Sequence, residues 1–184
     1  GAFVGTFRWG PANKIVLVDS EITLGKIYGS NHNSSTTSNN AISFMTAANF
    51  LAYGNNLNVV RVVGAGTYNA DANTSHANIT VENEAVFEAT FLNNNNNNLY
   101  GAFMGRYPGS LANSIKVAVC DSAKVFSSWD YKSYFTSAPG TSDHALSHGG
   151  SNDELHIVVI DANGQFSGVD GTVLETFGFV SKAY

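Results

Sequence analysis

The sequence is poor in the residues that charge, cross-link or chemically activate a protein. Only 12% of its 184 residues are charged, and it contains one cysteine and three prolines. The single cysteine, Cys120, excludes an intrachain disulfide and a thiolate metal cluster. The net charge of −5, without a cluster of lysine and arginine, argues against a nucleic-acid partner, because neutralising phosphates requires several cations on one face. No apolar run approaches the roughly 18 to 20 residues that cross a bilayer, so no membrane insertion is expected.

Uncharged polar residues take the place of charge. Asparagine, serine, threonine and glycine are abundant, and 43% of the residues are hydrophobic, as in a globular protein. A surface of amides and hydroxyls repels its own copies weakly, because like-charge repulsion is what keeps many proteins monomeric. The composition is therefore compatible with dense self-assembly.

The order of the predicted elements indicates a mixed α/β (α+β) fold. A small mixed sheet with two helices is expected first, followed by a β-rich region with long polar loops. We predict an N-terminal module over residues 1–66 and a β-rich region with exposed insertions over residues 67–184. Strands are predicted at 2–8, 14–18, 57–63, 115–120, 154–160 and 172–180, and helices at 21–28 and 40–53.

Capping signals define the two helices. Asp19 or Ser20 can cap the first helix, and Gly29 ends it. For the second helix, Gly54 is expected to supply a left-handed stop. Residues at three- and four-residue steps predict its apolar face: Ala41, Phe44, Met45, Ala48, Leu51 and Ala52.

Three polar segments are expected to form exposed loops. These are 30–40, the asparagine tract 93–98 and the long insert 121–153. None of them offers enough apolar area to offset the entropy of ordering it.

Histidines supply one candidate metal site, which we reject. His144 and His148 are spaced as two zinc ligands on one helical face, with Asp143 and His156 as further candidates. However, Gly149 and Gly150 follow at once, which makes a stable helix doubtful. Solvated loop histidines without a metal are the preferred interpretation.

Asp161, Asn163 and Gln165 resemble the start of a calcium loop. Phe166 stands where such a loop needs glycine, and Thr172 stands where it needs a bidentate glutamate. A β-hairpin turn is therefore expected instead.

No motif for catalysis or nucleotide binding is present. The chain lacks a G-x-S-x-G elbow, a phosphate-binding loop and a G-x-G-x-x-G fingerprint. Cys120 ends the apolar run 115–120 and is expected to be a buried, inert thiol. We therefore predict no catalytic, cofactor-binding or metal-binding residues, and no enzyme activity.

Several short motifs follow one another along nearly the whole chain. They are GAFVGTFRWGPA (1–12), VDSE (18–21), NFLAYGNNL (49–57) followed by VVRV (59–62), RYPGSLANSI (106–115) and ELHIVVID (154–161). In this order they resemble the contractile phage tail sheath protein family. Ala112 departs from the pattern, since glycine is usual there.

The resemblance implies a structural role in the virion. Sheath subunits polymerise around an inner tail tube and contract to drive the tube through the host envelope. The implied partners are neighbouring sheath subunits in a helical homo-oligomer, the inner tube protein, and the baseplate or tail terminator. The chain would be the N-terminal, outer part of a longer subunit, without its strand-exchange arms and tube-facing region. Assembly would occur in the host cytoplasm, and neither nucleic acid nor membrane would be a partner.

Other classes share some of these features. A sheath subunit of a bacterial contractile injection system or a tailocin would carry the same motifs. A surface adhesin would explain the polar composition and the glycosylation sequons at Asn33, Asn73 and Asn78, but not the ordered motifs. A hydrolase is least favoured, because no triad is visible.

Overall fold

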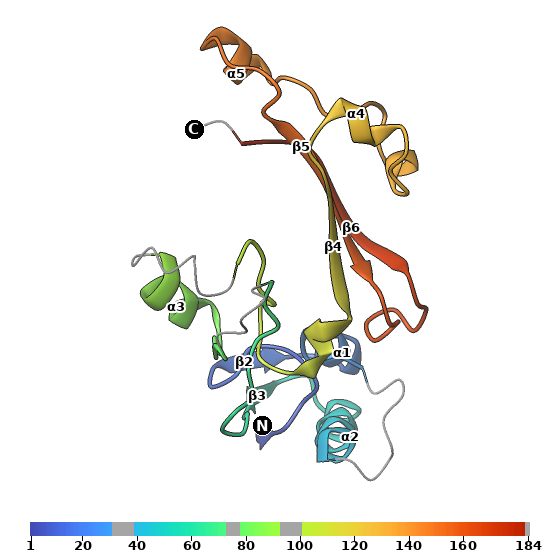
Figure 1. Ribbon diagram of the computed structural model, residues 1–184. Coiled ribbons are helices and arrows are strands. Elements are labelled where there is room, and N and C mark those ends of the chain that lie inside the picture. Colours follow the sequence, from blue (N-terminus) through green and yellow to red (C-terminus); the bar gives the residue numbers. More distant parts are fainter. Residues whose placement is uncertain (31–38, 73–77, 93–100, 183–184) are drawn as a thin grey trace. The chain divides into compact units, whose positions relative to one another are not determined.

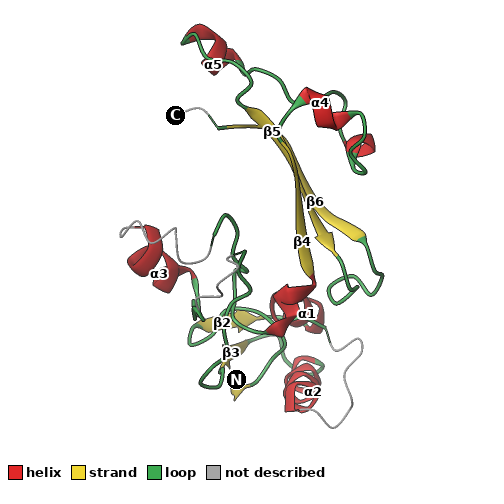
Figure 2. Cartoon of the chain, viewed as in Figure 1, coloured by secondary structure: helices red, strands yellow, loops and turns green. Residues whose placement is uncertain are grey.

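The computed structural model describes residues 1–30, 39–72, 78–92 and 101–182 (Figures 1 and 2). The chain divides into two compact units, 1–113 and 114–184. Both contain short helices and a three-stranded sheet, which confirms the predicted mixed α/β fold. The module boundary after Gly66 stays a prediction. The asparagine tract 93–98 lies outside the described residues, as do 31–38 of the predicted loop at 30–40.

The first unit contains a mixed sheet with the strand order β1-β3-β2. β3 (Leu57–Arg61) is central; β1 (Ala2–Gly5) runs parallel to it and β2 (Ile15–Val18) antiparallel. Two helices, α1 (Glu21–Tyr28) and α2 (Asn39–Leu51), pack against this sheet (Figure 1). The core between them is formed by Phe7, Val18, Leu24, Tyr28, Phe44, Ala47, Ala48, Leu57 and Val59.

Helix α1 has the predicted ends. The Ser20 hydroxyl accepts a hydrogen bond from the Thr23 amide at 3.2 Å, and Gly29 follows with φ 79°. The predicted stop at Gly54 is wrong, because Gly54 is not among the residues with positive φ. Its amide instead donates to the carbonyl of Phe50 at 3.0 Å, so a further hydrogen-bonded turn follows α2.

The apolar face of α2 is partly as predicted. Phe44 and Ala48 are buried, whereas Leu51 is half-buried at the margin of the core. Met45 and Ala52 are exposed, contrary to prediction. Successive residues are about 100° apart on a helix, so a narrow contact with the sheet buries only part of the apolar stripe.

Short helical segments follow the sheet in the described residues 67–72, 78–92 and 101–112. α3 (Glu84–Phe87) continues into the π-helix η1 (Glu88–Leu92), and the 3-10 helix η3 (Ser110–Ser114) leads out of the unit. Backbone hydrogen bonds hold this segment to the rest of the unit: the amide of Ala12 donates to Glu82 at 2.8 Å.

The second unit is built on an antiparallel sheet with the order β4-β5-β6. Its strands are β4 (Ile115–Cys120), β5 (Glu154–Asp161) and β6 (Thr172–Ser181), as the sequence predicted. The insert between β4 and β5 carries short helices: α4 (Ala123–Phe126), η4 (Lys132–Tyr134) and α5 (Asp143–Ser147). Across the described residues, no helix has the length and apolarity needed to cross a membrane.

Candidate functional site

Arg61 lies at the end of the central strand β3 and is almost fully buried, with 3% exposure. Its guanidinium donates to three backbone carbonyls: Nε to Phe7 at 3.0 Å, Nη1 to Gly10 at 2.8 Å and Nη2 to Pro108 at 2.8 Å. Burial lowers the pKa of Arg61 to about 10, an effect that the nearby Tyr28 hydroxyl partly opposes. Within the described ranges, Arg61 forms no ion pair with a carboxylate.

These four residues, Arg61, Phe7, Gly10 and Pro108, form what we call the Arg61 junction. It joins the loop after β1, the end of β3 and the turn at 107–109, which are far apart in the sequence. Gly109 has φ 129°, and a Cβ there would lie 3.2 Å from Nη2 of Arg61, so a side chain would be both strained and crowded.

An aromatic contact accompanies the junction. The rings of Trp9 and Tyr107 meet edge to face, with their centroids 5.3 Å apart. The motifs RWGP, VVRV and YPG, each weak in isolation, are therefore neighbours in space. The sequence analysis assigned no role to Arg61. Its position could have indicated one, because a single arginine at an inward-facing position of a β-branched strand must hydrogen-bond to acceptors inside the protein.

The three candidate histidines do not form one site. His144 lies in the first turn of α5 and His148 directly follows the helix; both are exposed, with ring centroids 4.5 Å apart. The doubt about a helix here was wrong, because the Ser142 hydroxyl caps it by accepting a hydrogen bond from the Ala145 amide at 3.2 Å. Among the residues that the structure describes, no three His, Cys, Asp or Glu side chains gather as metal ligands.

His156 was wrongly expected to be solvated. It is fully buried on β5, and its ring stacks on Phe135 with a centroid distance of 4.2 Å. Nε2 lies 2.9 Å from the Ser137 carbonyl, and Nδ1 lies 3.1 Å from the amide of Phe179. This pairing assigns the proton to Nε2 and leaves Nδ1 as an acceptor. Both ring nitrogens are thus engaged within the chain.

The Asp161 carboxylate organises the β5–β6 connection. It accepts hydrogen bonds from the amides of Gln165 at 3.0 Å, Phe166 at 2.8 Å and Ser167 at 2.8 Å. The hydroxyls of Ser114 and Ser167 also donate to it. Burial by itself raises the pKa of Asp161, but these hydrogen bonds outweigh it and bring the pKa to about 2. The connection is a β-hairpin loop whose carboxylate is already saturated by donors from the chain.

Cys120 is buried, as predicted, at the end of β4. Its Sγ lies 3.5 Å from the Ser122 carbonyl. Reaction of the thiol requires access to a reagent, which this burial denies.

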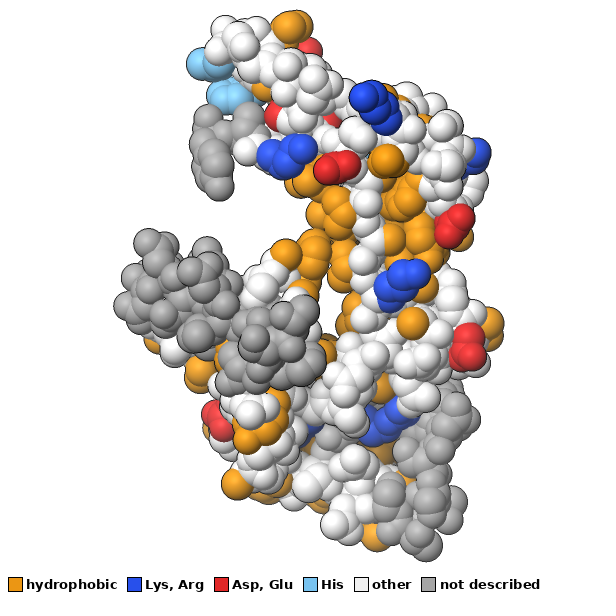
Figure 3. All heavy atoms as spheres, viewed as in Figure 1, with side chains coloured by type: hydrophobic (Ala, Val, Ile, Leu, Met, Phe, Trp, Pro, Cys, Tyr) orange, Lys and Arg blue, Asp and Glu red, His pale blue; other side chains and the backbone are white. Residues whose placement is uncertain are grey.

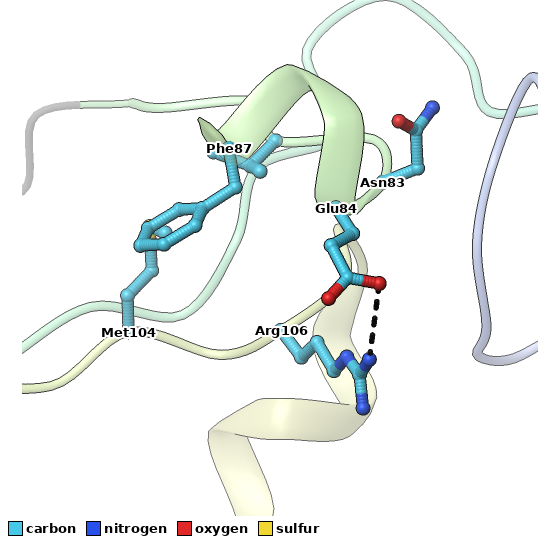
Figure 4. Close-up of a pocket in the computed structure, with 6 residues that line it drawn as sticks. Asn83, Glu84, Phe87, Met104 and Arg106 are labelled. Atoms are coloured by element: carbon cyan, nitrogen blue, oxygen red, sulfur yellow. Dashed lines mark ion pairs between the residues drawn. The ribbon is translucent and has the colours of Figure 1, made fainter. Parts of the chain in front are cut away.

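A pocket of about 330 Å³ lies beside α3 (Figure 4). Glu84 and Arg106 form an ion pair of 3.8 Å there, and both side chains are largely exposed. The Asn83 amide is occupied within the chain, since it donates to Ala12 at 3.0 Å and accepts from the Val86 amide at 3.2 Å. The lining residues offer apolar contact and one ion pair, but no nucleophile beside a base: Val81, Asn83, Glu84, Phe87, Met104 and Arg106.

Comparison with known proteins relates the chain to one family. Residues 2–62 match the model for the N-terminal region of domain III of the tail sheath protein Gp18. The chain is 34% identical over 174 residues to the tail sheath protein of Salmonella phage ViI, a match that covers 94% of this chain and 24% of that protein. Over 66 residues, which are 36% of the chain, it is 48% identical to the tail sheath protein of Vibrio phage KVP40. Over a stretch of the same length it is 44% identical to the tail sheath protein of Enterobacteria phage T4. Each of these matches covers 9% of the relative.

The matches cover only part of each relative. The chain spans about a quarter of the length of its ViI relative and a smaller share of the other two. No solved structure matches it. Two of the motif segments that meet at the Arg61 junction, the loop after β1 and strand β3, lie within the residues that the family model covers. The chain belongs to the tail sheath protein family of phages.

Proposed function

We propose that this chain is part of the sheath subunit of a contractile phage tail and has a structural rather than a catalytic role. In this proposal the subunit polymerises as a helix around the inner tail tube and contracts to drive the tube through the host envelope. The observation that carries the proposal is the match to a tail sheath protein along 94% of the chain.

The Arg61 junction supports the structural role. A component of a lattice that moves must keep its own shape while its contacts with neighbours change, because packed interiors do not deform continuously. Arg61 fixes three backbone segments at once by charged hydrogen bonds that solvent does not reach.

The proposed partners follow from the same role. Neighbouring sheath subunits are the principal partners, and the low fraction of charged residues, 12%, keeps repulsion between copies small. Contacts with the inner tube protein and with the baseplate or terminator are assigned to parts of the subunit beyond this chain. The virion tail is the proposed location, after assembly in the host cytoplasm. Phage origin is favoured over an injection system or tailocin because the matched relatives come from phages.

Sedimentation and electron microscopy test the proposal. We expect the full-length subunit to polymerise into tubes, while the 184-residue chain remains small at micromolar concentration. Terminal strands that pair with a neighbour's sheet edge are the proposed source of the difference. A full-length subunit that stays monomeric, and that is missing from purified tails, would refute the sheath role. Tubes from the 184-residue chain would show that the lattice contacts lie within it.

A further inference from the structure

The sheet of the second unit has one covered face and one open face. On the central strand β5, His156 and Val158 are fully buried and Ile160 is 2% exposed. Leu155 and Ile157, which alternate with them, are only half-buried. Side chains of a strand alternate between the two faces of its sheet. The exposure pattern therefore shows that, within this unit, one face is only partly covered, even at the middle of the sheet.

Strand register extends this open face over all three strands. Val119 pairs with Ile157 on one side, and Phe177 pairs with Ile157 on the other. Figure 3 shows hydrophobic side chains gathered over β4, β5 and β6. We define the open face as Val117, Val119, Leu155, Ile157, Val159, Phe177 and Val180. Glu175, which pairs with Val159 on the outer strand β6, adds a charge to it.

The sheet is also open at its sides. β4 and β6 are the outer strands, and within the described part of the chain neither pairs with a further strand. Long outer strands with free backbone groups normally need a partner or a cover, because they otherwise pair with other chains. A three-stranded sheet that is apolar on one face and open at both sides has the features of one part of a two-layered β-structure.

We propose that the open face is covered by a second β-sheet layer, contributed by another stretch of the same polypeptide. This inference rests on the proposed function, under which the chain is part of a longer sheath subunit. The ViI relative is long enough to contain such a further stretch, because the match covers only 24% of that protein. The covering layer presents aliphatic and aromatic side chains to Ile157 and its neighbours, as facing sheets do in a β-sandwich.

Solubility before assembly favours the same polypeptide over a neighbouring copy. A sheath subunit must stay dispersed until it polymerises at the right place. An apolar patch open in the free subunit would associate with other copies prematurely. Cover by a neighbour would arrive only with assembly, whereas cover within the subunit is present from folding onward.

Thiol accessibility tests this inference. Ile157→Cys is made in a Cys120→Ala background, both in the 184-residue chain and in the full-length subunit. Its reaction rate with a maleimide is measured in the chain, in the monomeric subunit and in the polymer. Val169→Cys, at a loop position that is 65% exposed, is the accessible control, and native Cys120 is the buried control. Val119→Cys, at a 42% exposed position of the open face, replaces Ile157→Cys if circular dichroism shows that the latter fails to fold.

The expected result is a difference between the chain and the monomeric subunit. In the 184-residue chain the Ile157→Cys thiol should react readily, although more slowly than the Val169→Cys control, because Ile157 is half-buried. In the full-length monomer it should react roughly a hundredfold more slowly, because only local opening then exposes it. Protection that arises only in the polymer would assign the cover to a neighbouring copy and overturn the inference. Protection already in the chain, or fast reaction in every sample, would overturn it as well.

The outcome separates this inference from the proposed function. A full-length subunit that protects the thiol but never forms tubes would leave the inference standing and refute the sheath role. A subunit that forms tubes while the thiol reacts freely in the monomer would support the sheath role and refute the inference about the covering layer.

Discussion

Replacing Arg61 should destabilise the first unit more than any surface change. Arg61→Met preserves the apolar stem but removes every donor to the carbonyls of Phe7, Gly10 and Pro108. A buried acceptor left without its donor costs about 1–3 kcal/mol, and some relaxation or water entry is expected at three such sites. We therefore expect the free energy of unfolding to fall by about 3–5 kcal/mol.

The measurement must isolate the first unit, because two units need not unfold together. Trp9 lies in the first unit and Trp129 in the second, so a Trp129→Phe background leaves Trp9 as the reporter. Urea unfolding followed by Trp9 fluorescence then gives the midpoint and the slope. The reporter contacts Tyr107 beside the junction, so it senses the loss of that geometry directly.

Arg106→Met is the matched control. Its guanidinium is exposed and pairs with Glu84 at 3.8 Å, an arrangement worth about 0–1 kcal/mol. Arg61→Lys should lie between the two, because one ammonium group cannot reach three carbonyls with the geometry of a guanidinium. If Arg61→Met costs no more than Arg106→Met, the junction does not hold the unit together and our reasoning about it fails.

Further predictions concern both units. Asp153 accepts hydrogen bonds from the hydroxyl of Ser181 and from the amide and hydroxyl of Ser142, which lower its pKa to about 2. The folded pKa values of Asp153 and Asp161 thus lie below the ordinary value of 3.8, so the stability that they contribute is present above about pH 4 and lost as the pH falls from about 4 to 2. Trp129 fluorescence during acid titration should show this loss, and Asp161→Asn should shrink it. His156→Phe keeps an aromatic ring but removes hydrogen bonds to two part-buried backbone groups, each worth about 0.5–1.5 kcal/mol, so urea unfolding should show a loss of about 1–3 kcal/mol; an unchanged midpoint would contradict this. Phe44→Ala should cost about 3–5 kcal/mol and half-buried Leu51→Ala distinctly less, and the reverse order in urea would refute the packing described for α2.

The elements that the sequence predicted well are those with local signals. The bounds of α1 follow from the Ser20 cap and from Gly29, whose φ of 79° suits glycine. The strands β4, β5 and β6 follow from β-branched runs between polar turns. In these segments the information lies within a few residues, so no knowledge of the tertiary contacts is needed.

The misjudged features depend on contacts that are distant in sequence. His156 was expected in solvent because it was grouped with the loop histidines His144 and His148, although it lies in the predicted strand 154–160. In the structure a stacked Phe135 and the Phe179 amide enclose it. The helix at α5 forms because Ser142 caps it, and Asp153 holds Ser142 in place by accepting a hydrogen bond from its hydroxyl at 2.7 Å. Neither partner can be identified from the pattern around the histidines.

The buried polar groups and the open apolar face have different meanings for the subunit. Arg61, Asp161 and His156 are all bound to backbone groups within their own units, so their chemistry is already used to fix the chain. Buried groups satisfied in this way hold loops rigidly but offer nothing to a ligand. The open face, in contrast, is only partly covered by the described residues of its own unit, although its side chains would gain free energy by leaving water. If the chain is part of a sheath subunit, the interactions proposed to complete that subunit at the open face are therefore apolar rather than ionic.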